Sequence, residues 1–109
     1  MELQFKNKDG FSIVYISGRI DTTNYNEFEK QISEKIEEAD DHIIINCEEL
    51  NFISSSGLRV FLMTQKKLKG TNRKLYLCNM QPAIKEIFDI SGFSQIFTIF
   101  ETEEEALQN

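Results

Sequence analysis

Metal-binding and redox-active residues are scarce in this chain. Its 109 residues include one histidine and two cysteines. His42, Cys47 and Cys78 do not show the spacing of metal ligands, so no metal site is expected. Both cysteines fall inside predicted strands, where a buried free thiol is more common than a disulfide in a cytosolic protein. The sequence therefore favours two free thiols and leaves a disulfide as the lesser alternative.

Long apolar segments and targeting signals are also missing. No apolar run approaches the roughly 20 residues that span a bilayer. The opening residues, Met1-Glu2-Leu3-Gln4-Phe5-Lys6, lack the apolar stretch of a secretory signal. We therefore expect a cytoplasmic protein with no membrane span. A length of 109 residues is typical of one domain with one modest core, so we expect residues 1–109 to form a single domain.

Catalytic motifs are absent as well. The chain has no Gly-x-Ser-x-Gly elbow, no phosphate-cradling glycine loop and no paired catalytic carboxylates. The single histidine, His42, begins a predicted strand and is distant in sequence from Ser55, the middle serine of a cluster described below. These absences indicate a protein that is not an enzyme and needs no cofactor.

Positive charge is in the minority. The chain has 12 Lys and Arg against 18 Asp and Glu, a formal net charge of −6, which argues against nucleic acid as the main partner. Acidic residues dominate from Asp21 to Asn51, whereas residues 57–85 contain basic residues and no acidic one. Two solvated helix faces are the plainer explanation, and a docking surface that helps to choose a partner is the alternative.

Hydrophobic spacing predicts that strands and helices alternate. Apolar residues alternate or run together in short segments, which is typical of strands. In the intervening segments they recur at three- and four-residue steps, which is typical of amphipathic helices. The expected order is β-β-α-β-α-β-α-β-α, with strands at residues 3–7, 11–17, 42–47, 74–79 and 96–100, and helices at residues 24–39, from about 56 to 69, after Pro82 and after Thr102.

A few residues set the expected boundaries. Asp9-Gly10 predicts a hairpin turn between the first two strands. Gly18 is expected to end the second strand, and Gly70 to cap the second long helix in a left-handed conformation. Pro82, the only proline, suits the first turn of the third helix. Five aromatic residues are expected in the core: Phe52, Phe61, Phe88, Phe93 and Phe97.

This order of elements predicts an α/β fold. Strands that alternate with helices imply a mixed central sheet with right-handed parallel βαβ crossovers and about four helices. In such sheets the functional loops lie at the carboxyl ends of the strands. Two loops, residues 18–24 and 48–56, are expected to meet there.

Three consecutive hydroxyls, Ser54-Ser55-Ser56, occupy the second of these loops. They precede a helix, whose N-terminus offers free backbone N–H groups and a partial positive charge, so the turn can hold a phosphate. N-capping explains one serine, but three exceed what a cap needs. The cluster is therefore a candidate phosphorylation switch, with plain capping as the alternative.

Three segments together resemble the STAS domain, and more narrowly the bacterial anti-sigma factor antagonists. They are Ser17–Asp21, Ile44–Leu58 and Pro82–Phe93, and they occur in the right order over nearly the whole chain. The resemblance implies the STAS fold and a non-enzymatic function. The unphosphorylated protein would bind an anti-sigma factor, itself a serine kinase of GHKL type, and so free the sigma factor. Phosphorylation of one serine would end that binding, and a PP2C-type phosphatase would reset it.

The resemblance also points to particular residues. The family's pattern is Asp-Ser-Ser/Ala-Gly, with phosphate on the serine that follows the Asp. That serine is Ser55 here, and Ser54 stands in place of the Asp. Asp21 matches an acidic residue of the neighbouring loop, although capping of the first helix explains it equally well. Gly57 is better explained by tight helix–strand packing than by an interface. The expected partner-binding residues are Asp21, Thr22, Ser54, Ser55, Ser56, Gly57 and Arg59.

One alternative function stays open within the same family. The chain could be a non-cycling STAS scaffold or adaptor, in a stress-signalling assembly or beside a lipid transporter, that binds a partner through the same turn. The two functions differ in whether Ser55 is ever phosphorylated. In either case we expect a monomer or a weak homodimer.

Overall fold

The first two strands form a hairpin at one edge of the sheet. In the computed structural model, which describes residues 1–109, β1 (Glu2–Lys8) pairs antiparallel with β2 (Phe11–Ile20). Asp9 and Gly10 both adopt positive φ angles, 52° and 83°. The favoured two-residue hairpin turns require such angles, and these residue types tolerate them. The predicted turn is therefore confirmed.

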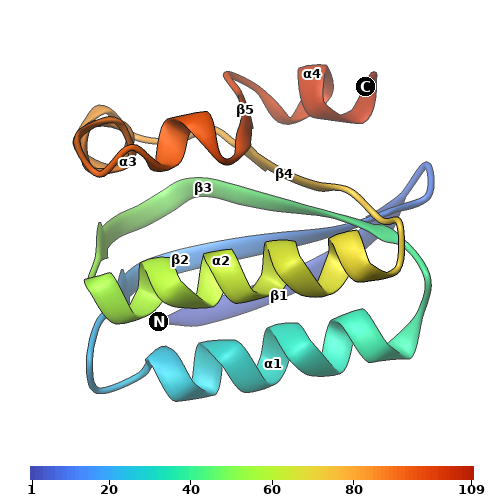
Figure 1. Ribbon diagram of the computed structural model, residues 1–109, viewed down its shortest axis with the longest axis horizontal. Helices are drawn as coiled ribbons and strands as arrows, with labels where there is room; N and C mark the ends of the chain where they lie inside the picture. The colour runs from blue at the N-terminus through green and yellow to red at the C-terminus, as the bar shows by residue number, and fades with distance from the viewer.

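The sheet has five strands in the order β1-β2-β3-β4-β5. Every neighbouring pair after the first is parallel, so the chain must cross over between strands through helices, as Figure 1 shows. The predicted mixed α/β sheet with parallel crossovers is confirmed. The remaining elements are β3 (His42–Ile53), β4 (Leu75–Cys78), β5 (Thr98–Phe100), α1 (Tyr25–Glu38), α2 (Ser55–Gly70), α3 (Pro82–Ile90), the 3-10 helix η1 (Phe93–Gln95) and α4 (Glu103–Leu107).

The main core lies between one face of the sheet and the helices α1, α2 and α3. Helix α1 buries Phe28, Ile32 and Ile36 at four-residue steps, as its sequence pattern predicts. Phe61 of α2 is fully buried, with its ring centroid 5.7 Å from that of Phe28 and 5.8 Å from that of Phe88 in α3. Phe61 therefore joins all three helices in one aromatic cluster.

Helix α4 covers part of the opposite face of the sheet. Ile13, Ile44 and Tyr76 come from three neighbouring strands in register and pack with Ala106 of α4. Because successive side chains of a strand point to opposite faces, Ile44 faces α4 while its two isoleucine neighbours face the main core. The central strand is thus buried on both sides, as its continuous isoleucine run predicted.

The ends of two strands were predicted too early. Strand β2 continues through Gly18 to Ile20, and β3 continues past Cys47 to Ile53. Gly18 adopts a φ of 93°, and the register between β2 and β3 shifts on both sides of Ser17–Gly18. These irregularities let the pairing pass through a left-handed glycine. The pairing also keeps Glu48 and Glu49 within β3, although glutamate has a low strand propensity.

Two other boundaries also differ from the prediction. Gly70 is the last residue of α2 and not its left-handed cap, because Asn72 takes the positive φ angle, 59°, in the turn that follows. Asparagine tolerates this conformation better than most residues other than glycine. The last strand begins at Thr98 and not at residue 96 because η1 and its end occupy the preceding segment.

Both cysteines are free and buried, as expected. Cys47 packs in the main core, whereas Cys78 belongs to the smaller cluster on the other face of the sheet. Burial raises the pKa of both thiols, that of Cys78 to about 12. Neither thiol is therefore a reactive thiolate near neutral pH.

Candidate functional site

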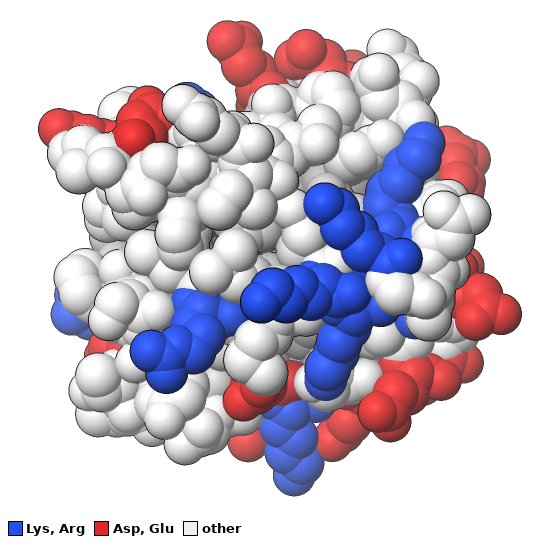
Figure 2. All heavy atoms as spheres, viewed as in Figure 1, with Lys and Arg blue, Asp and Glu red and all other residues white.

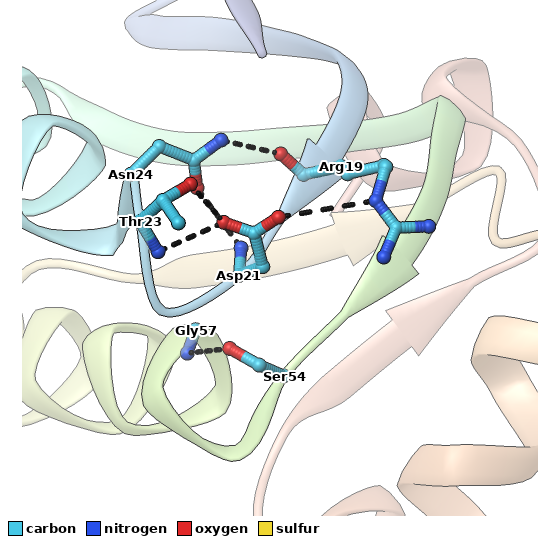
Figure 3. Close-up of polar contacts among 6 residues, drawn as sticks. All are labelled: Arg19, Asp21, Thr23, Asn24, Ser54 and Gly57. Carbon is cyan, nitrogen blue, oxygen red and sulfur yellow. Dashed lines mark hydrogen bonds and ion pairs between the residues drawn. The ribbon is translucent and has the colours of Figure 1, made fainter.

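The ends of β2 and β3 bring the two predicted loops together. Ile20 pairs with Ile53 across the two strands, and the Ser54 N–H donates a hydrogen bond to the Ile20 carbonyl at 2.9 Å. Asp21 follows the end of β2 and the serine cluster follows the end of β3, so both lie at the same edge of the sheet (Figure 3). The meeting of these loops was predicted from the order of the elements.

Ser54 is the N-cap of α2. Its backbone is extended, and its Oγ accepts a hydrogen bond from the Gly57 N–H at 3.2 Å. Its carbonyl accepts the first helical bond, from the Leu58 N–H at 3.0 Å. An aspartate caps a helix in the same way. Ser54 therefore caps α2 as an aspartate would, without the charge of an aspartate.

Ser55 is the first residue of α2 and the most exposed of the three serines. Its hydroxyl makes no hydrogen bond within the protein, and neither does that of the half-buried Ser56. The N–H groups of a first helical turn have no partners inside the helix and carry partial positive charge. The first turn of α2 contains no acidic residue. The partial positive charge of these N–H groups would therefore stabilise a negative group on Ser55, and no nearby acidic side chain of the first turn would oppose it.

Gly57 packs closely against the two strand ends. A Cβ at this position would lie 2.8 Å from Ile20 Cγ2 and 2.8 Å from Ile53 Cγ1. Both isoleucines are buried in the main core. These contacts support the packing explanation for Gly57, which lets the start of α2 approach the sheet.

Gly57→Ala is expected to destabilise the fold by about 1–3 kcal/mol, because an added methyl must displace packed core side chains. The better helix propensity of alanine offsets at most about 1 kcal/mol of this loss. Urea denaturation followed by circular dichroism measures the effect. Gly70→Ala is the matched control in the same helix, since a Cβ there meets no atom within 4 Å. The control should be neutral or slightly stabilising, and equal losses from the two variants would contradict the packing role.

Asp21 organises the loop after β2. Its Oδ1 accepts hydrogen bonds from the Thr23 N–H at 2.9 Å and the Thr23 hydroxyl at 2.6 Å, and its carbonyl accepts bonds from the N–H groups of Asn24 and Tyr25. The bonds from Thr23, the hydroxyl first, hold the pKa of the Asp21 carboxyl below its usual range. Its Oδ2 lies 3.9 Å from Arg19 Nε (Figure 3). Asp21 thus shapes the turn that leads into α1, but its carboxylate does not cap the helix, because the N-cap is Asn24 and no side chain bonds to the helix start.

Arg19 and Phe52 belong to the same surface, and the sequence did not assign them to it. They pair between β2 and β3, and the Arg19 guanidinium carbon lies 4.2 Å from the centroid of the Phe52 ring. Phe52 is half-buried and lies outside the core, contrary to expectation, because side-chain alternation along β3 turns Ile53 inward instead. The sequence feature that could have indicated Arg19 is its spacing from Asp21. Residues two apart in an extended chain lie on the same side, so the two charges can meet.

The last two predicted residues, Thr22 and Arg59, are exposed. Neither side chain makes a hydrogen bond or an ion pair within the protein. Thr22 lies in the loop after β2, and Arg59 lies on α2 one turn after Ser55. The structure therefore places all the predicted residues around the adjoining loops or on the first two turns of α2.

The single histidine of the chain lies far from the serine turn. His42 lies at the opposite end of β3 from the serine turn, and its Nδ1 accepts a hydrogen bond from the Lys74 N–H at 3.0 Å. It therefore cannot activate Ser55. No group of three or more His, Cys, Asp or Glu side chains is arranged to hold a metal ion. The helices are all too short or too polar to cross a bilayer.

Comparison with known families matches residues 2–106 to the model of the STAS domain. The chain belongs to the STAS domain family. This STAS protein is 31% identical over 106 residues to BtrV of Bordetella bronchiseptica, which is named as an anti-sigma factor antagonist. The match covers 97% of the chain and 91% of BtrV.

Two solved structures show the same fold as this STAS protein. A protein of Thermotoga maritima described as an anti-sigma factor antagonist superposes with a TM-score of 0.91 at 17% identity, over 97% of this chain and 92% of that one. The Bacillus cell-fate determinant SpoIIAA in its phosphorylated form superposes with a TM-score of 0.73 at 26% identity, over 98% of this chain and 97% of that one. The predicted STAS fold is therefore confirmed.

Proposed function

We propose that this STAS protein is an anti-sigma factor antagonist that is switched off by phosphorylation of Ser55. In the unphosphorylated state it binds an anti-sigma factor that is itself a GHKL-type serine kinase, and this binding releases the sigma factor. The kinase transfers phosphate to Ser55, the complex dissociates, and a PP2C-type phosphatase restores the binding form. The exposed, unpaired hydroxyl at the first residue of α2 carries this proposal.

The fold is well suited to accept phosphate at Ser55. A phosphoserine carries about −1.5 to −2 charges at pH 7. At the first turn of a helix such a charge is favourable by about 0.3–1 kcal/mol. The cap is provided by the hydroxyl of Ser54, which the modification leaves in place. Phosphorylation would therefore change the surface of the protein without unfolding the turn.

The same charge opposes a partner that packs against the turn. In the proposed complex, the loop of Asp21 and Thr22 and the turn of Ser54 to Gly57 form one contact surface. A partner covering that surface would have to desolvate the phosphate, and an unpaired buried charge costs several kcal/mol. Each 1.4 kcal/mol is about tenfold in affinity. One covalent change would thus separate the two proteins.

A non-cycling scaffold or adaptor is the second candidate function. It is favoured by one observation, the serine at position 54 where the family pattern has an aspartate. That replacement keeps the cap but removes a carboxylate next to the acceptor. In this alternative the same turn binds a partner and is never phosphorylated.

Incubation with the cognate kinase and ATP is expected to place one phosphate on Ser55, because Ser55 is the exposed serine of the three. Peptide mass spectrometry locates the phosphate. Ser55→Ala should abolish the labelling, and Ser54→Asp, which preserves a capping side chain, should leave the site of labelling unchanged. Phosphate found only on Ser54 or Ser56 would contradict the proposal. Complete absence of phosphate would favour the scaffold.

A further inference from the structure

The exposed face of α2 carries cations that the fold does not use. Three residues, Arg59, Lys66 and Lys69, are exposed, and their side chains make no hydrogen bond or ion pair within the protein. The ion pairs of the molecule lie elsewhere, at Arg19–Asp21, Lys35–Glu38 and Lys85–Asp89. Figure 2 shows Lys and Arg side chains gathered over α2 on this face of the molecule. We call Arg59, Lys66 and Lys69 the α2 basic stripe.

The other basic residues near α2 have structural roles. Lys67 donates a hydrogen bond to the hydroxyl of Ser33 in α1 at 3.0 Å. Arg73 donates to the carbonyls of Ile36 and Ala39 at the end of α1, at 3.0 and 2.7 Å. These contacts hold α1 against α2 and the turn that follows it. The α2 basic stripe is distinct because its cations bind nothing in the free protein.

The α2 basic stripe shares a helix face with Ser55. Ser55, Arg59, Met63, Lys66 and Lys69 follow one another at steps of three and four residues, which is the spacing of neighbours along one side of a helix. From Ser55 to Lys69 this side is about 21 Å long, at about 1.5 Å per residue. Met63, in the middle, is a large apolar side chain that is 36% exposed. The face therefore combines positive charge with one apolar contact point.

The acidic residues around the α2 basic stripe favour a partner that contacts α2 and little else. The chain has a net charge of −6, and α1, which packs beside α2, exposes Glu27, Glu34 and Glu37. A broad polyanion such as a membrane surface or a nucleic acid would extend over α1 as well as α2, and these carboxylates and the negative net charge would repel it. An acidic helix lying along α2 would contact the cations and avoid most of that repulsion.

We infer that the α2 basic stripe is a docking surface for an acidic, amphipathic helix of a protein partner. Its carboxylates face Arg59, Lys66 and Lys69, and one of its apolar side chains packs on Met63. This inference rests on the proposed function in one respect, that the partner is the anti-sigma factor. Phosphate on Ser55 would place negative charge at one end of the stripe, where it would repel the carboxylates of the docked helix. Phosphorylation would then weaken docking along α2 as well as at the turn.

The double variant Lys66→Glu/Lys69→Glu tests the docking surface. It is expected to bind the cognate anti-sigma factor about tenfold or more weakly in calorimetry, because like charges would face each other along the helix. The matched control is Lys8→Glu/Lys30→Glu, which changes the net charge equally at exposed lysines that also lack partners. The control should keep its affinity. Added salt should weaken the wild type more than the Lys66/Lys69 variant. Equal affinities of the two double variants would overturn the inference.

A direct probe of α2 separates this inference from the proposed function. A synthetic amphipathic helix of Glu and Leu is titrated into the ¹⁵N-labelled protein, and the same peptide with Lys for Glu is the comparison. The acidic peptide alone should shift the amide resonances of Arg59, Met63, Lys66 and Lys69. No shift, or shifts with vesicles containing phosphatidylserine but not with the peptide, would overturn the inference. Failure of Ser55 to be phosphorylated would affect the proposed function and leave this result intact.

Discussion

Ser55→Asp is expected to weaken binding of the anti-sigma factor by about a hundredfold or more. The carboxylate would lie at the exposed first residue of α2, inside the proposed contact surface. Burying it without a counter-ion costs several kcal/mol, and about 2.7 kcal/mol already corresponds to a hundredfold. Isothermal titration calorimetry of the variant and of the unphosphorylated wild type with the anti-sigma factor measures the loss. The fold should be unharmed because a negative charge is favourable at this end of the helix.

Two further substitutions separate charge from shape at this position. Ser55→Asn matches the size of Asp without its charge and should bind much more tightly than Ser55→Asp. Ser55→Ala should bind as the wild type does and should remain bound in the presence of ATP. Thermal melting of all three variants checks that the turn stays folded. If Asn and Asp weaken binding equally, shape and not charge controls the complex.

Phe61→Ala is expected to lower the free energy of unfolding by about 3–5 kcal/mol, as large-to-small changes at buried aromatic residues do. Phe61 is fully buried, and its ring lies within 6.4 Å, between centroids, of those of Phe28, Phe88 and Phe97. Its removal would leave a cavity where α1, α2 and α3 meet. Such a loss is a large fraction of the roughly 5–15 kcal/mol of a typical domain. Urea denaturation measures it.

Phe52→Ala is the control for this prediction. Phe52 is half-buried, lies outside the core, and contacts the guanidinium of Arg19. An exposed cation–π contact contributes about 0.5–1 kcal/mol, so this variant should lose far less stability than Phe61→Ala. A comparable loss in the two variants would contradict the larger contribution expected of the buried aromatic cluster.

The course of the main chain could be predicted because hydrophobic spacing is local information. The four-residue steps of Phe28, Ile32 and Ile36 indicate a helix wherever that helix packs. Asp9-Gly10 indicates a hairpin turn because few residue types accept its positive φ angles. Where the prediction stopped too early, at Gly18 and Cys47, the deciding interaction was pairing with a neighbouring strand. That pairing depends on residues distant in sequence.

The roles of the three serines also depend on residues that are distant in sequence. The sequence indicated that capping explains one of Ser54, Ser55 and Ser56 and that Ser55 is the phosphate acceptor. It did not say which serine forms the cap, and the structure gives the cap to Ser54. The first residue of a helix depends on where the preceding strand ends, and here the Ser54 N–H is held by the carbonyl of Ile20 in β2.

The sequence by itself determined the order of elements, the mixed sheet and the meeting of the two loops, because periodicity and the rules of parallel crossovers are sufficient for these. Only the tertiary structure decided which serine caps α2, why Gly57 has no room for a side chain, and that Arg19 and Phe52 share the site surface. It also decided which cations remain unpaired. These properties depend on the spacing between packed elements, which no local pattern of residues records.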